Sequence, residues 1–427
     1  MIEAWRAKIS SDSYRLTFLS SSLFSIRMLI GAIHSLYLLS TGVSLQNLAN
    51  LQIVFSTTVL LFELPTGIIA DLYSRRLSII LACLSLFLFY VLCTFSPNLY
   101  LLMLSEFFYG VGLCLISGAL ITWLHELIQI DFPTDKMMIN KLTHLKNEWS
   151  SIGSMVLAAL GTLIIALGSK YFLFVYLLCA VLMLLLSFLF YQVRCDASIG
   201  KSGRPSYLNY FKDTFKSLIV DMSSSKGILY LVVACSLVVI YQPIFHYWQP
   251  LFMDLGKRND YVGSSIESTA ILLGVAFAAK SIFTYFFNRL ARKWIESHTS
   301  PYNLGIISSI FSSLFIIGLS LFVKSNLFAA VALFSLFHGS LSLVGSASQS
   351  EYLKSIKNQD KTASILSAVA LVSRVFGIIA LSALALFVTN DNLLYFFAGT
   401  STLFAIILIA FIKWKSITTM ENIGVGK

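Results

Sequence analysis

Apolar runs of about 20 residues recur along the whole chain, and this repetition is what most limits its fold. Each run is long enough for a helix to cross a bilayer, where only helices or closed barrels satisfy their backbone hydrogen bonds. The chain is 57% hydrophobic and 12% charged, whereas a soluble domain carries about 25% charged residues. We therefore predict an all-α membrane protein with twelve transmembrane helices. They cover residues 16–39, 46–70, 77–95, 100–127, 147–168, 171–191, 227–247, 265–287, 303–323, 327–350, 362–387 and 393–412.

The basic residues orient these spans. If the N-terminus is cytoplasmic, 23 of the 30 Lys and Arg residues fall in cytoplasmic segments, 4 fall outside, and the other three lie within spans. Because Lys and Arg gather in cytoplasmic loops, this bias predicts a multi-pass protein with both termini in the cytoplasm. The net charge of +10 thus has a topological explanation, and we expect no nucleic-acid partner.

A long polar stretch, residues 192–226, follows the sixth span. It contains Gly, Ser, Pro and six basic residues. It predicts an N-terminal six-helix half at 1–191, a cytoplasmic linker at 192–226 and a C-terminal six-helix half at 227–427. The segment YLNYFKDTFKSLI within it fits either an amphipathic helix on the inner membrane surface or a plain linker.

A short motif follows the second span of each half. Asp71 to Arg76 read DLYSRR, and Asn288 to Lys293 read NRLARK. Each begins with an acid or an amide, continues with two residues and a small residue, and ends with two bases. Equivalent motifs at equivalent topological positions indicate an internal duplication.

With GIIADLYSRR between its second and third spans, the chain resembles the major facilitator superfamily of secondary transporters. The signature of that family at this loop is G-x-x-x-D-x-x-G-R-K/R; Gly67, Asp71, Arg75 and Arg76 match it, and Ser74 replaces the second glycine. The preceding FELPTG resembles an exporter-rich branch that includes multidrug and peptide-antibiotic efflux proteins. The fifth span lacks the G-P-x-x-G-G-type pattern of well-known drug/proton antiporters.

The resemblance assigns this motif to a cytoplasmic gate, which latches the two halves when such a transporter faces outward. An acid at position 71 suits the partial positive charge of a helix N-terminus, and the arginines suit acids or lipid headgroups. The alternative is a positive-inside loop with an incidental acid. The second copy has an amide in place of the acid, which predicts a weaker latch. The gate residues are Gly67, Asp71, Arg75 and Arg76, with Asn288, Arg292 and Lys293 in the second copy.

Ionisable side chains inside spans are costly and mark candidate functional positions. Arg27 and Arg374 lie near the middle of their spans, and on an unbroken helix His34 shares a face with Arg27 because it follows two turns later. The resemblance places the first, fourth, seventh and tenth spans around a central cavity. The alternatives are pairing of the arginines with acids or backbone carbonyls, and structural hydrogen bonds for the histidines. The cavity candidates are Arg27, His34, Arg374, His338 and His246.

Two carboxylates lie inside spans and are proton-coupling candidates. Glu106 is favoured because the fourth span is expected to face the cavity, whereas for Glu63 a structural salt bridge is an equal alternative. Snorkelling to the membrane edge explains Lys280 as well as function does. The aromatic stretch YQPIFHYWQP, Tyr241 to Pro250, fits an interfacial belt first and an outer vestibule second.

These observations favour a secondary active transporter of a small molecule or short peptide in the bacterial inner membrane. Our preferred interpretation is proton-coupled export of an anionic or zwitterionic compound by alternating access, as in an antiporter. The rivals are a nutrient importer or uniporter of the same fold and a membrane receptor or scaffold that does not transport. The sequence has no Walker loop, nucleophile elbow or H-E-x-x-H motif, so we expect no enzyme and no cofactor. No cluster has metal-ligand spacing; the expected partners are the substrate, protons and the bilayer.

Overall fold

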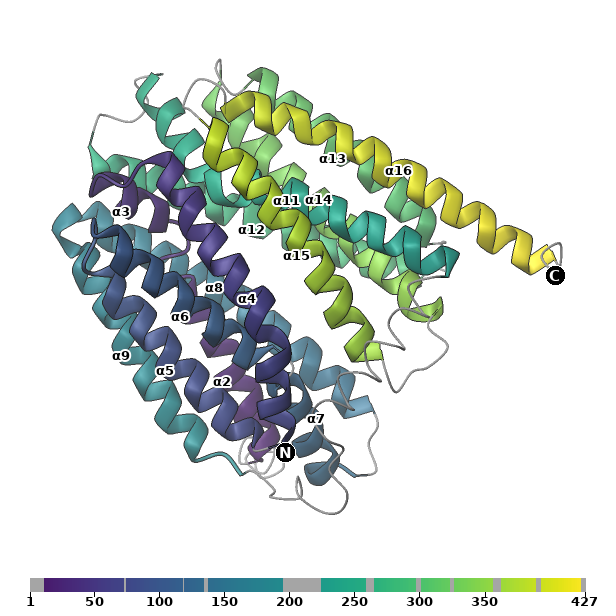
Figure 1. Ribbon diagram of the computed structural model, residues 1–427, viewed down its shortest axis with the longest axis horizontal. Coiled ribbons are helices and arrows are strands. Elements are labelled where there is room, and N and C mark those ends of the chain that lie inside the picture. The colour runs from purple at the N-terminus through teal and green to yellow at the C-terminus, as the bar shows by residue number, and fades with distance from the viewer. Residues whose placement is uncertain are drawn as a thin grey trace. The chain divides into compact units, whose positions relative to one another are not determined.

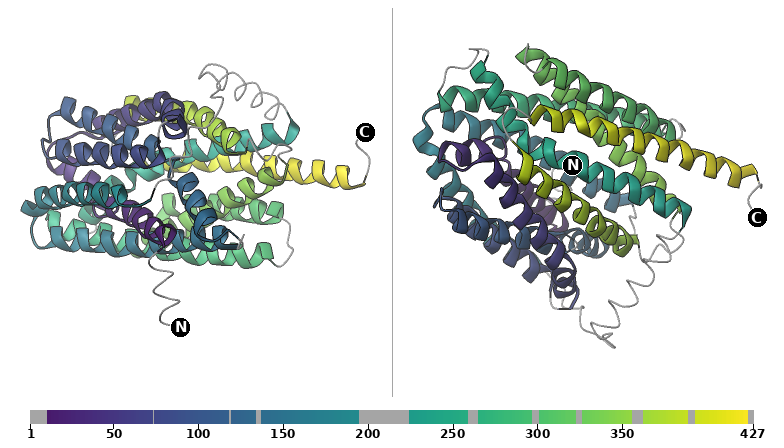
Figure 2. Two further views of the ribbon diagram at one scale, coloured as in Figure 1. Left: turned by 90° about the horizontal axis from the view of Figure 1, so that it is seen from below. Right: turned by 45° about the horizontal axis from the view of Figure 1, so that its top comes forward.

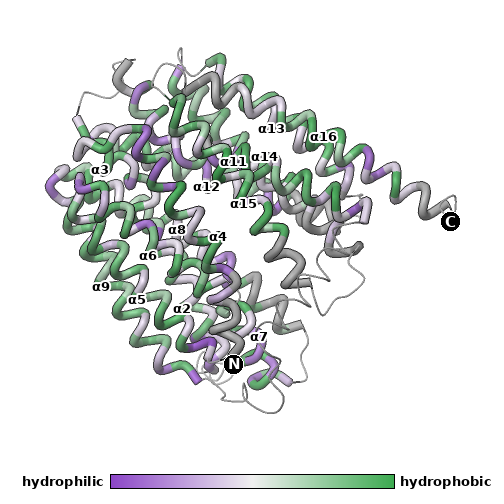
Figure 3. Tube along the Cα trace, in the orientation of Figure 1, coloured by the Kyte–Doolittle hydropathy of each residue, from purple (hydrophilic) through white to green (hydrophobic). Residues whose placement is uncertain are grey.

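The computed structural model describes residues 11–72, 74–117, 119–133, 137–194, 224–258, 265–296, 301–322, 326–355, 362–388 and 393–423. Within these ranges all regular structure is helical. Eleven of the helices described are long and apolar enough to cross a membrane. Apolar residues predominate along much of the helices, as Figure 3 shows. The prediction of an all-α membrane protein is therefore confirmed.

The helices fall into two units, and Figures 1 and 2 show long helices running side by side within each unit. The first unit contains the described residues up to 194 together with 265–275. Its elements are α2 (Asp12–Arg27), α3 (His34–Ser40), α4 (Leu45–Leu72), α5 (Arg75–Cys93), α6 (Leu99–Ile116), α7 (Ala119–Asp131), α8 (Met137–Ala166), the 3₁₀ turn η1 (Ser169–Tyr171) and α9 (Phe172–Tyr191).

The second unit contains the described residues of 224–258 and 276–423. Its helices are α11 (Ser225–Arg258), α12 (Ile266–Glu296), α13 (Pro301–Phe322), α14 (Leu327–Ser355), α15 (Thr362–Phe387) and α16 (Leu393–Ile423). Helix α12 is divided, because its first ten residues belong to the first unit. The predicted linker falls almost entirely outside the described residues, so the predicted domain boundaries stay predictions.

The two units share one pattern of helix neighbours. In the first unit, α5 packs against α6 and α9, and α2 packs against α7, α8 and α9. In the second, α13 packs against α14 and α16, and α11 packs against α14, α15 and α16. If the six spans of each unit are counted in chain order, with α6 and α7 together as the fourth span, these are the same pairs. Equal neighbours at equal positions support the internal duplication that the repeated motif indicates.

The first predicted span, 16–39, is not one helix. Helix α2 ends at Arg27 and α3 begins at His34. Between them the backbone continues as turns, in which the N–H groups of Leu29 and Gly31 bond to carbonyls three residues back, at 3.0 Å each. Tighter bonds of this kind inside a helix often mark a hinge. The two pieces have 16 and 7 residues, which explains why this span is not among the eleven helices that are long and apolar enough to cross a membrane.

The fourth predicted span, 100–127, is also broken. Helix α6 ends at Ile116 and α7 begins at Ala119, and Ser117 has a non-helical ψ of −87°. The sequence here is Ser-Gly, and such pairs are a common cause of helix kinks. Both breaks lie in the first unit, in spans that the sequence analysis treated as continuous helices.

Several helices extend beyond the predicted spans, among them α8, α11, α12 and α16. Helix α8 begins at Met137 rather than near 147, and α11 continues to Arg258 rather than ending near 247. Charged and polar residues end an apolar run in the sequence, but many of them are good helix formers and continue the helix. His246 and the aromatic stretch therefore lie inside α11. Tyr247 and Trp248 are buried, so the expectation of an interfacial aromatic belt was wrong for them.

Side-chain caps explain where two helices of the first unit begin. The Ser74 hydroxyl accepts a hydrogen bond from the Leu77 N–H at 3.3 Å and caps α5. The Asn98 side chain accepts from Tyr100 N–H and Leu101 N–H at 3.1 and 3.2 Å and caps α6. Serine and asparagine satisfy the free N–H groups of a helix start. The serine that replaces a signature glycine at position 74 thus has a structural role of its own.

Candidate substrate and proton sites

Arg27 is the last residue of α2 and lies directly before the break in the first span. Its guanidinium donates a hydrogen bond to the Tyr109 hydroxyl at 2.6 Å. The guanidinium carbon also lies 5.2 Å from the centre of the Tyr109 ring and 5.8 Å from that of Phe24. Its Nε is buried and has no hydrogen-bond partner among the described residues. Arg27 therefore retains an unused donor.

Lys146 approaches the same ring as Arg27. Its ammonium lies 5.8 Å from the centre of Phe24, and the residue is only 8% exposed. Among the described residues no carboxylate lies within ion-pair distance of Lys146 or Arg27. Two cations around one ring repel each other, and the burial of Lys146 and partial burial of Arg27 remove much of the water that would compensate them. The sequence analysis missed Lys146 because it placed this residue in a loop, whereas it lies inside α8.

His34 and Glu106 are brought together although they belong to different helices. His34 begins α3, and its Nδ1 lies 2.6 Å from the Tyr176 hydroxyl. Its Nε2 lies 3.9 Å from Oε1 of Glu106. Glu106 is 3% exposed, and its Oε2 has no hydrogen-bond partner among the described residues. The sequence analysis selected both residues but related His34 to Arg27 through a continuous helix, which the break removes.

Glu63 lies in α4 and contacts the break in the fourth span. One of its carboxylate oxygens accepts a hydrogen bond from the Ser117 hydroxyl at 2.6 Å. The structural alternative for Glu63 was a salt bridge with a basic residue; the partner is instead a neutral hydroxyl. The Ser-Gly pair at 117 was the sequence signal for this contact, because it marks a kink where a side chain is free to turn toward a neighbouring helix.

The gate motif is described in part. Gly67 and Asp71 lie in α4, but their side chains are outside the described residues. Arg75 forms an ion pair with Glu126 of α7. Arg76 donates to the carbonyl oxygen of Tyr191 at 3.3 Å, and its guanidinium lies 5.3 Å from the centre of that ring. Both arginines thus connect the start of α5 to neighbouring helices of the first unit.

Of the three predicted gate residues in the second copy of the motif, Asn288 alone has a described side chain. Its Oδ1 accepts a hydrogen bond from the Ser342 hydroxyl of α14 at 3.0 Å. The side chains of Arg292 and Lys293 are outside the described residues. The latch role of either copy stays a prediction.

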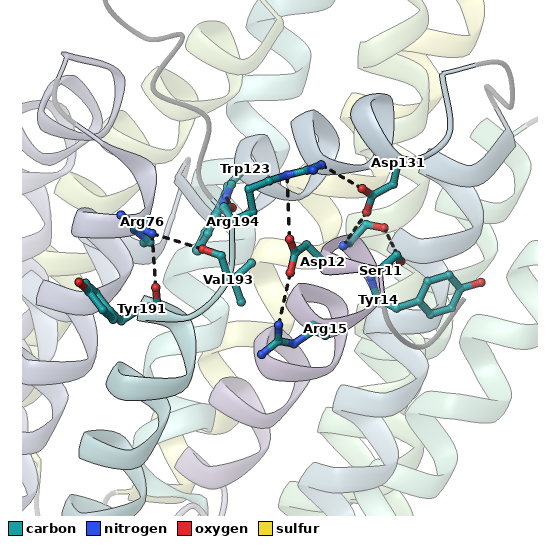
Figure 4. A network of polar contacts seen from close by, with 11 residues as sticks. Ser11, Asp12, Tyr14, Arg15, Arg76, Trp123, Asp131, Tyr191, Val193 and Arg194 are labelled. Carbon is teal, nitrogen blue, oxygen red and sulfur yellow. Dashed lines mark hydrogen bonds and ion pairs between the residues drawn. The ribbon is translucent and has the colours of Figure 1, made fainter. Parts of the chain in front are cut away.

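A network of charged groups, shown in Figure 4, surrounds Arg194 at the end of α9. Its guanidinium lies 3.1 Å from Asp131 of α7 and 3.9 Å from Asp12 of α2. The second oxygen of Asp131 accepts the backbone N–H of Ser13 at 3.0 Å. Trp123 donates its indole N–H to the Arg194 carbonyl at 3.2 Å. The sequence analysis assigned Arg194 to the linker, whereas the network joins it to two helices.

The remaining cavity candidates lie in the second unit. His338 of α14 is 6% exposed and is surrounded by aromatic rings, the nearest being Phe334 with centroids 4.6 Å apart. His246 of α11 packs against Phe245, with centroids 5.1 Å apart. Arg374 is partly buried in α15. Each unit is described by itself, so the cavity roles of these residues stay predictions.

The comparison with known proteins decides the family. The sequence pattern of the Major Facilitator Superfamily matches residues 16–319, which is more than half of the chain. The chain belongs to this superfamily. A curated relative, an uncharacterised MFS-type transporter, YxaM, of Bacillus subtilis (strain 168), is 26% identical over 242 residues. That match spans 56% of this chain and 59% of the relative's length.

Solved structures of the superfamily fold are also similar. The crystal structure of the nucleoside transporter NupG superposes with a TM-score of 0.72 at 12% identity and covers 94% of this chain and 98% of that one. A D-xylose–proton symporter superposes with a TM-score of 0.68 at 13% identity and covers 94% and 96%. At such low identities the likeness shows the fold alone. It confirms the predicted twelve-helix major facilitator fold, and membership indicates a transporter rather than an enzyme. The exporter-like branch stays a prediction.

Proposed function

We propose that this superfamily member exports a small anionic or zwitterionic compound, or a short peptide, in exchange for protons. The observation that carries the proposal is a pair of cations, the partly buried Arg27 and the buried Lys146, which share the Phe24 ring without a carboxylate partner among the described residues. A buried cation is stabilised when a mobile anion neutralises it. The two six-helix halves would rock about the site and expose it to each side of the inner membrane in turn.

Arg27 is the proposed anchor for the anionic group of the substrate. A guanidinium binds a carboxylate or phosphate through two parallel hydrogen bonds. Tyr109 occupies one donor of Arg27, and the buried Nε has no partner among the described residues. Lys146 adds a second positive charge and three donors. The rival in which Arg27 is neutralised by Glu63 or Glu106 is disfavoured, because those carboxylates contact Ser117 and His34 instead.

His34 and Glu106 form the proposed proton site. A carboxyl group and an imidazole at 3.9 Å can hold a proton and pass it on, because each is able to bind and release one. Tyr176 fixes the orientation of the imidazole through Nδ1. Protonation of this pair in one orientation of the transporter and its release in the other would drive the substrate against its gradient.

The direction of transport rests on the resemblance of FELPTG, residues 62–67, to exporters. The second candidate function is proton-coupled import or uniport. The shared fold with a D-xylose–proton symporter favours it as an alternative, since one fold supports both directions. Everted and right-side-out vesicles distinguish the two: an exporter accumulates substrate inside everted vesicles under a proton gradient, whereas an importer accumulates it in right-side-out vesicles.

The anion hypothesis is tested in everted vesicles with acidic antibiotics and acidic peptides, each beside its neutral methyl ester. Arg27→Lys keeps the positive charge but loses the paired N–H donors of the guanidinium, and Arg27→Gln loses both the charge and the paired donors. We expect the apparent affinity for the acids to fall stepwise, by about tenfold for each step, because a hydrogen bond to a charged group contributes about 1.5–3 kcal/mol. The apparent affinity of Lys146→Gln for the acids should fall about as far as that of Arg27→Lys. Lys170→Gln, which changes an exposed lysine, is the matched control.

Uptake of the esters should change little in all four variants. If Arg27→Gln impairs acids and esters equally, Arg27 has a structural role. If Arg27→Gln and Lys146→Gln both transport the acids like the wild type, neither residue binds the anion and the proposed function fails.

The proton site is tested with Glu106→Gln, which keeps the shape of the side chain but cannot release a proton. We expect substrate binding to remain and accumulation driven by a pH gradient to fall to the level of facilitated exchange. Glu148→Gln, which changes an exposed carboxylate of α8, is the control, and Glu63→Gln tests the second candidate. Normal accumulation by Glu106→Gln would exclude it as the proton carrier.

A further inference from the structure

The second unit contains a partly buried cation of its own. Lys280 lies ten residues before the end of the apolar segment Ile266–Leu290 of α12, about 15 Å at 1.5 Å per residue. A lysine side chain is shorter than this distance, which disfavours snorkelling. Its ammonium instead lies 4.6 Å from the centre of the Phe277 ring and 6.0 Å from that of Phe245.

The surroundings of Lys280 do not supply a counter-ion. Among the described residues no carboxylate lies within ion-pair distance of its ammonium. His338 of α14 approaches the pair of rings that lies beside Lys280, because its ring centroid is 6.2 Å from that of Tyr241, which stacks on Phe245. His338 is almost fully buried, and its Nε2 has no hydrogen-bond partner among the described residues. A cation and an imidazole nitrogen thus flank one pair of stacked rings, and both have unused hydrogen-bonding capacity.

Two aromatic rings of α11 connect these groups. Tyr241 and Phe245 stack with centroids 5.2 Å apart and an angle of 25° between their planes. Tyr241 also approaches His338, with centroids 6.2 Å apart, while Phe245 approaches Lys280. These rings remain 40% and 43% exposed, whereas their neighbours Tyr247 and Trp248 are buried. The stacked pair therefore has exposed ring surface beside the Lys280 ammonium.

We propose that Lys280, His338, Tyr241 and Phe245 form a binding site for an aromatic carboxylate. The carboxylate would accept hydrogen bonds from the Lys280 ammonium and from Nε2 of His338, and its ring would stack on the exposed pair. One ammonium balances the single negative charge of a carboxylate, whereas a phosphate dianion would leave excess charge in an apolar site. Stacked or edge-to-face contacts add affinity beyond the area that they bury.

This inference deepens the proposed function, because it names the class of compound that is carried. Its test does not depend on transport. The purified full-length protein in lipid nanodiscs is heated with 2-naphthoate or with its neutral analogue 2-naphthamide, and the midpoint of thermal unfolding is measured. A ligand that binds the folded state raises this midpoint as its concentration increases. Normal transport of acids by the Arg27 and Lys146 variants would end the proposed function but would leave this measurement unaffected.

We expect 2-naphthoate to raise the midpoint of the wild type and of Lys170→Met, and 2-naphthamide to have no such effect. Lys170 is the matched control, because its ammonium also lies over a ring, that of Tyr171 at 5.3 Å, but on an exposed side chain. Lys280→Met should lose the response to 2-naphthoate, and Lys280→Arg should retain part of it. Without ligand, Lys280→Met should unfold at a higher temperature than the wild type, because it no longer buries a charge.

Tyr241→Ala provides a second test that leaves the cation in place. It should weaken 2-naphthoate binding about threefold to tenfold, as expected for the loss of one aromatic contact. The proposal is overturned if Lys280→Met responds to 2-naphthoate like the wild type, or if the acid and the amide stabilise the wild type equally. If Lys280→Met does not fold, an unchanged affinity in both Lys280→Arg and Tyr241→Ala overturns it.

Discussion

At the scale of single residues, small side chains set the separation of α2 and α8. The hydroxyls of Ser21 and Ser25 donate to carbonyl oxygens of α8, at 3.0 and 3.3 Å. A methyl group at Gly161 would overlap the carbonyl oxygen of Leu29, which lies in the break of the first span. The backbone of α8 therefore approaches that break directly, and the position tolerates only glycine.

Gly161→Ala should separate α8 from the break. Backbone atoms cannot move aside as a flexible side chain can, so we expect a loss of about 1–3 kcal/mol in the free energy of unfolding, as in other overpacked sites. Thermal or denaturant unfolding in nanodiscs measures it. Gly345→Ala is the control, because no atom lies within 4 Å of a methyl group there. Equal stability of the two variants would contradict the close approach.

The candidate residues themselves were predictable, but their partners were not. Arg27, His34 and Glu106 stand out because charge is rare inside apolar runs. Tyr109 and Tyr176 are ordinary aromatic residues of such runs, and only the packing of helices distant in sequence brings them to Arg27 and His34. The sequence also could not show which acid His34 approaches, since that depends on the break that turns α3 away from the line of α2.

At the scale of elements, Asp131 joins two helix ends. Its carboxylate receives the Ser13 N–H in the first turn of α2 and the Arg194 guanidinium after the end of α9. A carboxylate near a helix N-terminus satisfies a free N–H group and interacts favourably with the helix dipole. Asp131 thus supplies from α7 part of the cap that Ser11 begins locally.

Asp131→Ala should loosen the start of α2 and the end of α9 together. We expect faster amide hydrogen exchange at Ser13 and at residues 192–194, with a loss of stability of about 1 kcal/mol. Asp131→Asn keeps an acceptor for Ser13 but loses the charge, so it should free Arg194 more than Ser13. If exchange in Asp131→Ala stays at the wild-type rate at both ends, the network does not fasten them.

The number of membrane spans was predictable from the sequence, whereas the ends and breaks of the helices were less so. Apolar runs report where a helix crosses the membrane, and they located every span. They do not report the polar helical turns beyond it, which is why α8 and α11 are longer than predicted. The break after Arg27 has no strong signal, because Gly31 is its only glycine and tight turns need no special residue.

At the scale of the whole molecule, the gate hypothesis concerns how the two halves alternate. Asp71→Asn removes the charge at the end of α4 and keeps the shape of the side chain. We expect normal amounts of protein in the membrane but at least a tenfold loss of transport, because the inward-facing state becomes relatively more stable. Vesicle transport and accessibility of cysteines from the cytoplasmic side measure this. Wild-type flux in Asp71→Asn would remove the latch role.

The predicted topology is tested at position 205, which lies outside the described residues. In a variant with Pro205→Cys as its single cysteine, an impermeant maleimide should react in everted vesicles and not in intact cells, because 23 of the 30 basic residues favour a cytoplasmic location for this segment and both termini. Labelling from outside intact cells would invert the predicted orientation.

The division of α12 between the two units has a consequence for biosynthesis. Glu267 accepts the Ser169 N–H at 2.8 Å, and Gly274 lies where any larger residue would meet Thr162 of α8. The ribosome makes these partners about a hundred residues apart, with the whole of α11 between them. A nascent chain arrested after α9 therefore lacks a piece of its first unit. We expect such chains to be digested readily by protease until synthesis passes residue 275, and to become resistant only then.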